Sequence, residues 1–247
     1  MSQQVALVTG GFGGIGYAIC KALYHQGIQV IATYHHHSLE SAQEWQLEQR
    51  KNGFDFDIVH VDVGNFASCE QMAREVIEKH GKVDILVNNA GITRDRSCNK
   101  MSKEEWDIVI ITDLNSIFYV THSLLDGMRA RKYGRIINIS SINGQKGQFG
   151  QVNYSAAKAG IHGFTKALAL ETAAHQITVN TISPGYVETD MIMSIGEEIR
   201  NKILAEIPMG RFARPDEIAR VVVFLARDDN GYITGANITI NGGHYML

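Results

Sequence analysis

The sequence predicts an α/β fold built on a single doubly wound parallel sheet with helices on both faces. Short apolar runs rich in β-branched residues alternate along the chain with longer stretches of helical period. The short runs are almost continuously apolar, which is typical of parallel strands covered by helices on both sides. Because crossover connections are right-handed, this alternation favours a doubly wound topology.

One apolar run is available for each expected strand, beginning with Val-Ala-Leu-Val-Thr at 5–9. The expected strands are 5–9, 29–33, 57–62, 83–88, 134–140, 177–183 and 237–241. The expected helices are about 14–26, 39–52, 66–80, 103–131, 153–175 and 215–227. The pattern never breaks, so we predict a single domain over 1–247. Its least regular segment, 188–214, is predicted to form a substrate lid.

Composition narrows the classes of function. The chain is 45% hydrophobic and 20% charged with a formal net charge of −3, which gives no electrostatic reason to expect nucleic acid or a membrane as partner. No apolar run approaches the roughly 20 residues that span a bilayer, and no signal peptide is apparent, so we expect a cytoplasmic protein. Cys20, Cys69 and Cys98 lack any CxxC spacing and are predicted to be reduced thiols without a metal.

A glycine cluster follows the first predicted strand and opens the first predicted helix. Its glycines, Gly10, Gly13, Gly14 and Gly16, allow a tight turn and a close approach of the backbone to a pyrophosphate. The helix N-terminus offers unpaired N–H groups and a partial positive charge to that anion. A tight turn alone would also explain glycines, but the position between strand and helix favours a dinucleotide site.

Further motifs stand in order behind this loop. Asn88-Asn89-Ala90-Gly91 ends the fourth strand, Ser141 precedes Tyr154, Lys158 stands four residues beyond, and Pro184-Gly185 follows the sixth strand. With the TGxxxGIG spacing of the loop, the chain resembles the short-chain dehydrogenase/reductase family over essentially its whole length. The resemblance implies a Rossmann-like fold, a nicotinamide cofactor and hydride transfer at a carbonyl carbon.

The four-residue spacing places Tyr154 and Lys158 on one face of a helix. A nearby ammonium lowers the pKa of a phenol from its free value of about 10 and makes it a workable general acid. The resemblance assigns proton donation to Tyr154, ribose binding and pKa tuning to Lys158, and carbonyl polarisation to Ser141. Ser140 is the competing serine, but the spacing to Tyr154 favours Ser141.

One catalytic position departs from the family. Most active relatives have Asn where this chain has Asp113, at a position that belongs to a proton relay reaching the lysine. A carboxylate there would raise the pKa of Lys158 and weaken its pull on Tyr154. Alternatively, Asp113 points to solvent or pairs with a neighbour.

The resemblance also implies a set of cofactor contacts. They are Gly10, Gly13, Gly14, Ile15, Gly16, Asp62, Val63, Asn89, Ala90, Gly91, Tyr154, Lys158, Pro184, Gly185, Val187 and Thr189. The second strand ends in 32–38 without Asp or Glu, so nothing repels a 2′-phosphate, and NADPH is favoured over NADH. No Arg or Lys grips the phosphate either, which leaves His35, His36 and His37 as candidate donors or as a solvated loop.

The loop 143–151 between Ser141 and Tyr154 indicates the substrate. It looks like that of family members that reduce acetoacetyl-CoA to the (R)-3-hydroxyacyl thioester with NADPH, feeding polyhydroxybutyrate synthesis. The predicted substrate contacts are Asp95, Ser141, Gln148, Phe149, Gln151 and Tyr186. The glutamines offer amide donors, and the two aromatic rings offer apolar walls for a short acyl chain. Arg94, Arg200 and Lys202 are candidates for the CoA phosphates, or ordinary surface charges.

Three rival functions stay open. The first is reduction of a thioester carried by acyl carrier protein, the second a weakly catalytic dinucleotide-binding sensor, and the third a sugar or steroid alcohol dehydrogenase. The family resemblance also implies a homotetramer, with the helices at 103–131 and 153–175 and the last strand as interface elements.

Overall fold

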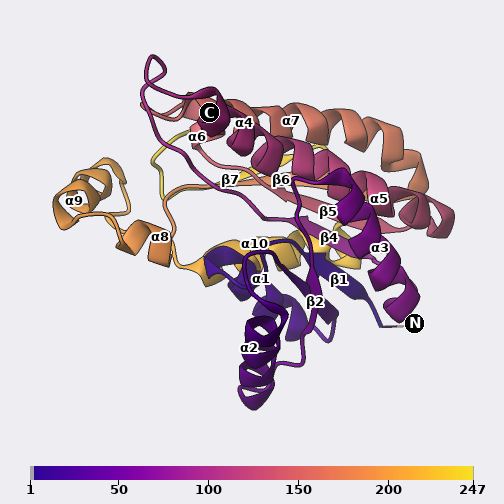
Figure 1. The fold of residues 1–247 in the computed structure, drawn as a ribbon. Helices are drawn as coiled ribbons and strands as arrows, with labels where there is room; N and C mark the ends of the chain where they lie inside the picture. The colour runs from indigo at the N-terminus through magenta and orange to yellow at the C-terminus, as the bar shows by residue number, and fades with distance from the viewer. Residues whose placement is uncertain (1–2, 247) are drawn as a thin grey trace.

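Within the described residues, 3–246, a computed structural model places seven parallel strands in one sheet, in the order β3-β2-β1-β4-β5-β6-β7 (Figure 1). The strands are β1 Val5–Val8, β2 Gln29–Tyr34, β3 Asp57–His60, β4 Ile85–Asn88, β5 Gly134–Ile139, β6 Ile177–Pro184 and β7 Asn237–Ile240. Each predicted strand is present, and no end differs from its predicted position by more than two residues. The predicted doubly wound sheet is confirmed, with the chain reversing direction across the sheet between β1 and β4.

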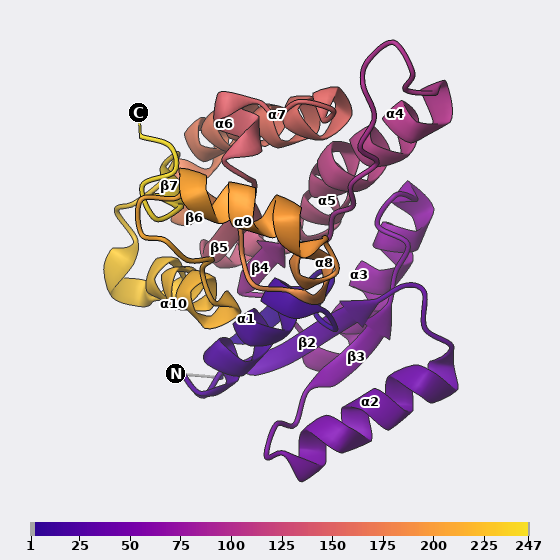
Figure 2. The same ribbon diagram turned by 90° about the vertical axis from the view of Figure 1, so that its left-hand side faces the viewer.

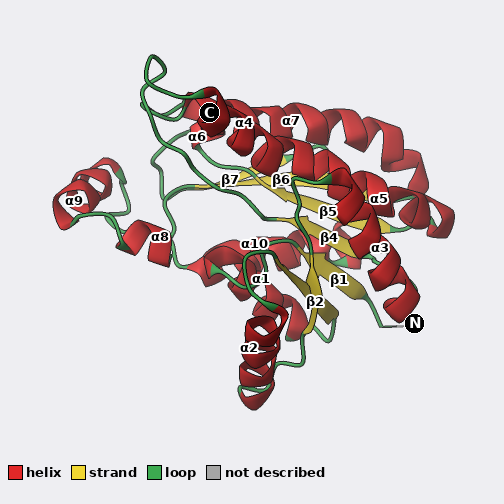
Figure 3. Ribbon diagram, in the orientation of Figure 1, coloured by secondary structure: helices red, strands yellow, loops and turns green. Residues whose placement is uncertain are grey.

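Helices cover both faces of the sheet (Figure 3). The helices that matter here are α1 Gly14–Tyr24, α2 Leu39–Lys51, α3 Phe66–His80, α4 Lys103–Ile110, α5 Ser116–Arg131, α6 Asn143–Lys146, α7 Val152–Thr172, α8 Asp190–Met193, α9 Glu197–Glu206 and α10 Pro215–Ala226. On one face, α1 and α10 bury apolar side chains such as Leu23 and Val222. On the other, α3, α5 and α7 contribute Met72, Leu124 and Leu168 to a second core.

Local signals fix the ends of several helices. The side chains of Ser38 and Asn65 accept hydrogen bonds from backbone N–H groups in the first turns of α2 and α3. Ser102 and Glu105 form a capping box at the start of α4. Gly81 ends α3 in the left-handed region at φ 77°, where a side chain would be strained.

The predicted helix 103–131 is present in extent but is not one regular helix. A π-helical turn, Ile111–Asn115, separates α4 from α5 and carries Asp113. By length and composition alone, Lys103–Arg131 could cross a membrane. In the structure its inward face, with Val109, Val120 and Leu124, packs into the core beside the sheet. The apolar pattern of 103–131 does not predict the π turn, which is a local widening often found at functional sites.

The segment 188–214 carries α8 and α9 to one side of the sheet in Figure 1, and in Figure 2 the two helices lie in front of it. It is less irregular than its sequence suggests, because it contains α8 and α9. The loop 143–151 likewise contains a short helix, α6, that its glycines did not predict. None of the side chains of α9 is fully buried, so this helix adds nothing to either core.

We expect Leu124→Ala to destabilise the protein because the leucine is buried in the core beneath α5. Truncation of a buried leucine costs about 2–5 kcal/mol. Leu47→Ala on α2 is the matched control, since Leu47 is exposed. Urea unfolding followed by circular dichroism measures both; equal losses of stability would contradict the assignment of Leu124 to the core.

Candidate active site

A cleft of about 790 Å³ opens at the carboxyl ends of β1, β4, β5 and β6. This is the edge where the strand order reverses, and where parallel sheets of this topology bind ligands. The structure gathers most of the predicted site residues there. They are Gly10, Gly13, Gly14, Ile15, Gly16, Asn89, Ala90, Gly91, Asp95, Asp113, Ser141, Gln148, Phe149, Gln151, Tyr154, Lys158, Pro184, Gly185, Tyr186, Val187 and Thr189.

The glycine loop is tightly folded between β1 and α1. Gly10 has φ 65°, and a Cβ on Gly16 would lie 2.1 Å from the Gly10 carbonyl oxygen. The Asn89 side chain donates to the carbonyl oxygens of Thr9 (3.0 Å) and Gly10 (3.3 Å), which fastens the loop to the end of β4. Asn89 thus has a structural task beside its predicted cofactor contact.

The start of α1 is shaped to receive an anion. Gly13 is the N-cap residue and provides no side-chain cap, so the first N–H groups of the helix are free for a ligand. A Cβ on Gly13 would meet nothing within 4 Å, whereas one on Gly14 would lie 2.9 Å from Thr189 Cγ2. The residues present therefore fit a dinucleotide whose pyrophosphate lies over the helix N-terminus.

Two predicted cofactor residues lie outside the cleft. Asp62 follows β3; its Oδ1 accepts a hydrogen bond from the Gly64 N–H (2.9 Å) and lies 4.0 Å from His35 Nε2. Val63 is buried against the second core. Both stand beside the end of β2 and away from the reacting centre, so their contact with a cofactor stays a prediction.

Tyr154 and Lys158 lie one turn apart on α7, as predicted, with Lys158 Nζ 5.5 Å from the centre of the Tyr154 ring. Ser141 follows β5, lines the same cleft as Tyr154 and lowers the pKa of that phenol. Ser140 is buried and donates its hydroxyl to the Lys158 carbonyl oxygen at 2.8 Å. The structure therefore turns Ser141, and not Ser140, toward the tyrosine.

Asp113 does not point to solvent. Its side chain is 0% exposed, and its Oδ2 lies 3.1 Å from Lys158 Nζ. The Lys158 side chain is also buried, with 5% of its surface exposed. Oδ1 accepts a hydrogen bond from the Ile92 N–H at 2.8 Å. Lys158 also donates to the Ile139 carbonyl oxygen at 3.1 Å. Of the alternatives open from the sequence, Asp113 pairs with a neighbour, and that neighbour is Lys158.

This ion pair sets the electrostatics of the tyrosine. Burial raises the pKa of Tyr154 above its ordinary value, and the Asp113 carboxylate raises it further. The Lys158 ammonium and the Ser141 hydrogen bond act in the opposite direction. Burial lowers the pKa of Lys158, but the carboxylate outweighs this and holds it above its usual range. Lys158 therefore stays charged while part of its effect on the phenol is cancelled.

The substrate side of the cleft carries a chain of polar side chains. Gln151 donates to Asp95 Oδ2 (2.8 Å) and accepts from the Asn143 amide (2.9 Å). Asn143 Oδ1 is buried without a partner among the described residues, and Tyr186 lines the same cleft. Phe149, whose side chain is 90% exposed, lies at the rim. Gln151, the centre of this chain, was predicted from the sequence, whereas Asn143 was not.

The cleft has an apolar wall that the sequence analysis missed. It is formed by Ile192 of α8, Ile195 after it, and Ile199 and Ile203 of α9, all within the segment 188–214. The four-residue spacing of Ile199 and Ile203 was a readable signal, because it places these two on one face of a helix. Together with Phe149 and Ile92 they give the cleft that contains Tyr154 a partly apolar lining.

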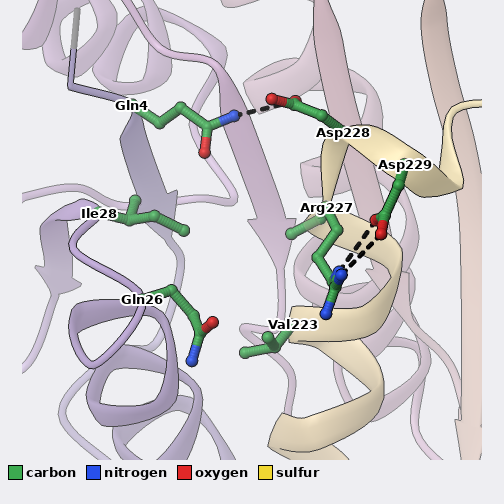
Figure 4. A pocket seen from close by; sticks show the side chains of 8 residues that line it. Gln4, Gln26, Ile28, Val223, Arg227, Asp228 and Asp229 are labelled. Atoms are coloured by element: carbon green, nitrogen blue, oxygen red, sulfur yellow. Dashed lines mark hydrogen bonds and ion pairs between the residues drawn. The ribbon is translucent and has the colours of Figure 1, made fainter. Parts of the chain in front are cut away.

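A second, smaller hollow of about 320 Å³ lies near the beginning of β2, beside Ile28 (Figure 4). Its polar groups satisfy one another: Arg227 pairs with Asp229 at 2.6 Å, and Gln4 bonds to Asp228 at 3.3 Å. It contains none of the predicted site residues, so the cleft above β1 and β4 is the candidate active site.

Comparison with known proteins agrees with this geometry. Residues 10–245 match a family model described as enoyl-(acyl carrier protein) reductase. An acetoacetyl-CoA reductase of Allochromatium vinosum is 54% identical, over 98% of this chain and 99% of the relative. One of Cupriavidus necator is 48% identical over the full length of both. A 3-oxoacyl-[acyl-carrier-protein] reductase of Vibrio cholerae is 44% identical over 100% of this chain and 99% of the relative.

The chain belongs to the short-chain dehydrogenase/reductase family. It is therefore an oxidoreductase that works with a nicotinamide dinucleotide. In a member of this family, the free N–H groups at the start of α1 have a natural ligand in the cofactor pyrophosphate. Tyr154 and Lys158 line the same cleft as this helix N-terminus.

We expect Asp113→Asn to shift the pH profile of catalysis. Loss of the carboxylate removes a charge that raises the pKa of Tyr154. Alcohol oxidation needs the phenolate and starts as pH rises through that pKa, so its onset should move to lower pH. Carbonyl reduction needs the phenol, so its decline at high pH should also begin earlier. The maximal rate should change by less than about tenfold, or ~1.4 kcal/mol.

The control is Asp107→Asn, which removes an exposed carboxylate on α4 that pairs with Lys103. Initial rates across the pH range, with either oxidised or reduced nicotinamide, compare the two variants with the parent. A profile in Asp113→Asn that is unchanged, or shifted to higher pH, would show that the carboxylate does not act on Tyr154.

Proposed function

We propose that this protein reduces acetoacetyl-CoA to (R)-3-hydroxybutyryl-CoA with NADPH, the step that feeds polyhydroxybutyrate synthesis. The observation that carries the proposal is the polar chain Asp95–Gln151–Asn143, which lines the same cleft as Ser141 and Tyr154. A 3-oxoacyl thioester has two carbonyl oxygens, and the cleft offers hydroxyl donors on Ser141 and Tyr154 as well as amide side chains. Two acetoacetyl-CoA reductases align with nearly the whole chain.

In the proposed reaction the reduced nicotinamide supplies the hydride to C3 of the substrate. Ser141 donates a hydrogen bond to the C3 oxygen, and Tyr154 gives it a proton as negative charge develops. Lys158 keeps the transfer favourable by stabilising the phenolate that remains, and Asp113 holds the lysine charged. The acyl chain lies along the isoleucines of the lid, which exclude water from the reacting carbon.

The preference for NADPH is supported by the end of β2. No carboxylate follows Tyr34 there to accept a ribose 2′-hydroxyl. His35 and His36 stand at this end with ring centres 4.3 Å apart, and His60 of β3 lies 5.9 Å from His35. We propose that these imidazoles donate hydrogen bonds to the 2′-phosphate, because no Lys or Arg is available at 32–38.

The second candidate is reduction of the same 3-oxoacyl group on acyl carrier protein. It is favoured by the Vibrio cholerae relative, which is a 3-oxoacyl-[acyl-carrier-protein] reductase. The chemistry at Tyr154 would be identical, so the two candidate reactions differ in the group that carries the thioester, which is CoA in one and acyl carrier protein in the other. A weakly catalytic sensor is less well supported, because Asp113 leaves Ser141, Tyr154 and Lys158 in register.

We also propose that the chain acts in the cytoplasm as one domain and as a homotetramer. The supporting observation is exposed apolar surface on the long helices, with Ile108, Phe118 and Leu170 in the solvent. Phe118 stacks with Phe66 of α3 to extend this patch. Burial of such patches is a common reason for association, and size-exclusion chromatography with light scattering measures it directly.

Tyr154→Phe should abolish most turnover while leaving the fold and cofactor binding intact. The variant keeps the ring beside Lys158 but loses the proton donor, and loss of a general acid lowers rates by about 10²–10⁴. NADPH titration by fluorescence measures binding, and acetoacetyl-CoA reduction measures turnover. Brisk turnover in this variant would rule out Tyr154 as the proton donor.

The decisive assay is oxidation of NADPH and NADH, in parallel, with acetoacetyl-CoA and with acetoacetyl-acyl carrier protein. We expect rapid oxidation of NADPH with the CoA thioester and at least about tenfold lower kcat/KM with NADH, equal to ~1.4 kcal/mol. Faster turnover of the carrier-protein thioester would favour the second candidate. Equal rates with both cofactors would overturn the role given to the histidines.

A further inference from the structure

The lid, 188–214, is closed at its base but not along its length. Val187 bridges to Ala213, the Glu188 N–H donates to the Ala213 carbonyl oxygen (2.8 Å), and the Ala213 N–H donates to the Tyr186 carbonyl oxygen (3.0 Å). Above this base, α9 has no fully buried side chain. Ile207, the residue after α9, is buried, so the lid is anchored at this end more than along α9.

The exit of the lid is held by the chain that follows β7. The Met209 N–H donates to the Gly242 carbonyl oxygen at 3.1 Å. Gly242 and Gly243 have positive φ values of 63° and 85°, and a Cβ on them would lie 3.1 Å from Ile207 and 3.2 Å from Pro208. This turn of two glycines thus lies directly against the segment that leaves α9.

His244 follows that turn and joins two parts of the site. Its side chain is 5% exposed, and its Nε2 lies 3.3 Å from Glu206 Oε2 at the last residue of α9. Its ring stacks on Tyr186, with centres 5.8 Å apart and planes 21° from parallel. Tyr186 lines the same cleft as the polar chain Asp95–Gln151–Asn143.

The environment of His244 is unusual for a structural residue. Glu206 is 66% exposed, so its carboxylate is free to leave, while His244 Nδ1 is buried without a partner among the described residues. A buried imidazole with one unpaired nitrogen loses solvation that a leucine would not lose. Packing against Tyr186 alone does not require a histidine. The contact between His244 Nε2 and Glu206 Oε2 explains why a histidine stands at this position.

We propose that His244 is a positioning residue that latches the lid to the substrate pocket. Through Nε2 it holds the end of α9, and through its ring it fixes the orientation of Tyr186. When the latch is made, the isoleucines of the lid and the Tyr186 ring form a continuous wall around the acyl chain. When it breaks, α9 swings on the base at 187 and 213, and the cleft opens to solvent.

Two substitutions separate the two contacts. His244→Phe keeps a flat ring against Tyr186 but cannot bond to Glu206, whereas His244→Gln keeps an amide donor for Glu206 but loses the ring. Glu206→Ala removes the bond from the lid side. Removal of a negative charge from a helix C-terminus favours the helix itself, so any loosening in this variant comes from the lost anchor. Glu188→Ala, an exposed carboxylate at the opposite end of the lid, is the control.

Limited trypsin digestion measures how readily the lid opens, and it needs no substrate. Arg200 and Lys202 lie on α9, so cleavage there reports how often the lid opens. We expect cleavage about threefold to tenfold faster in His244→Phe and Glu206→Ala. His244→Gln and Glu188→Ala should be cut at the parental rate. Parental rates in both His244→Phe and Glu206→Ala would overturn the latch.

The kinetic experiment rests on the proposed function, whereas the proteolysis experiment does not. A failure of the latch can therefore be distinguished from a failure of the proposed function. With acetoacetyl-CoA, loss of the latch should raise KM roughly threefold or more while kcat stays within about twofold, because Tyr154 and Lys158 are untouched. His244→Gln should raise KM through Tyr186 without faster proteolysis. A fall in kcat with unchanged KM in these variants would contradict the positioning role.

Discussion

The buried charge of Lys158 is the constraint around which the active site is built. An ammonium removed from water is costly unless a counter-charge and hydrogen bonds surround it. Asp113 supplies the charge at 3.1 Å, and the Ile139 carbonyl oxygen supplies a second acceptor. The π turn presents the carboxylate, and a Cβ on Gly91 would lie 2.7 Å from Asp113 Oδ2, so only glycine fits beside the pair. The π turn, Gly91 and Asp113, which are far from Lys158 in the sequence, thus all contribute to stabilising its buried charge.

The ion pair between Asp113 and Lys158 also connects the helices that carry the site. Asp113 lies at the junction of α4 and α5, and Lys158 lies on α7, so the ion pair joins neighbouring helices on one face of the sheet. Loss of either partner would leave a buried charge unpaired, whereas an amide in place of the carboxylate keeps the shape without the charge. The identity of residue 113 therefore tunes the proton donor with little change in the architecture.

Periodicity and glycine placement predicted most of the fold, because strands and helices here bury apolar stripes of ordinary length. The cleft was also predictable, since parallel strands place the residues after their carboxyl ends together. The π turn at Ile111–Asn115 was not, because a single added residue in a turn leaves the apolar pattern almost unchanged. The partner of Asp113 was left open because an ion pair between distant segments has no local signal. Asn143 and His244 escaped notice for the same reason: their roles come from contacts with residues 8 and 38 or more positions away.

The independence of α9 from both hydrophobic cores has a consequence for how such an enzyme changes over time. Substitutions on the lid alter the wall that the acyl chain meets, yet they remove no contact that the sheet and its covering helices need. Stability and substrate range can therefore vary separately, and a chain of this kind can try new side chains against new acyl groups with little risk of misfolding. Divergence among its relatives should accordingly accumulate in the lid before it reaches the strands.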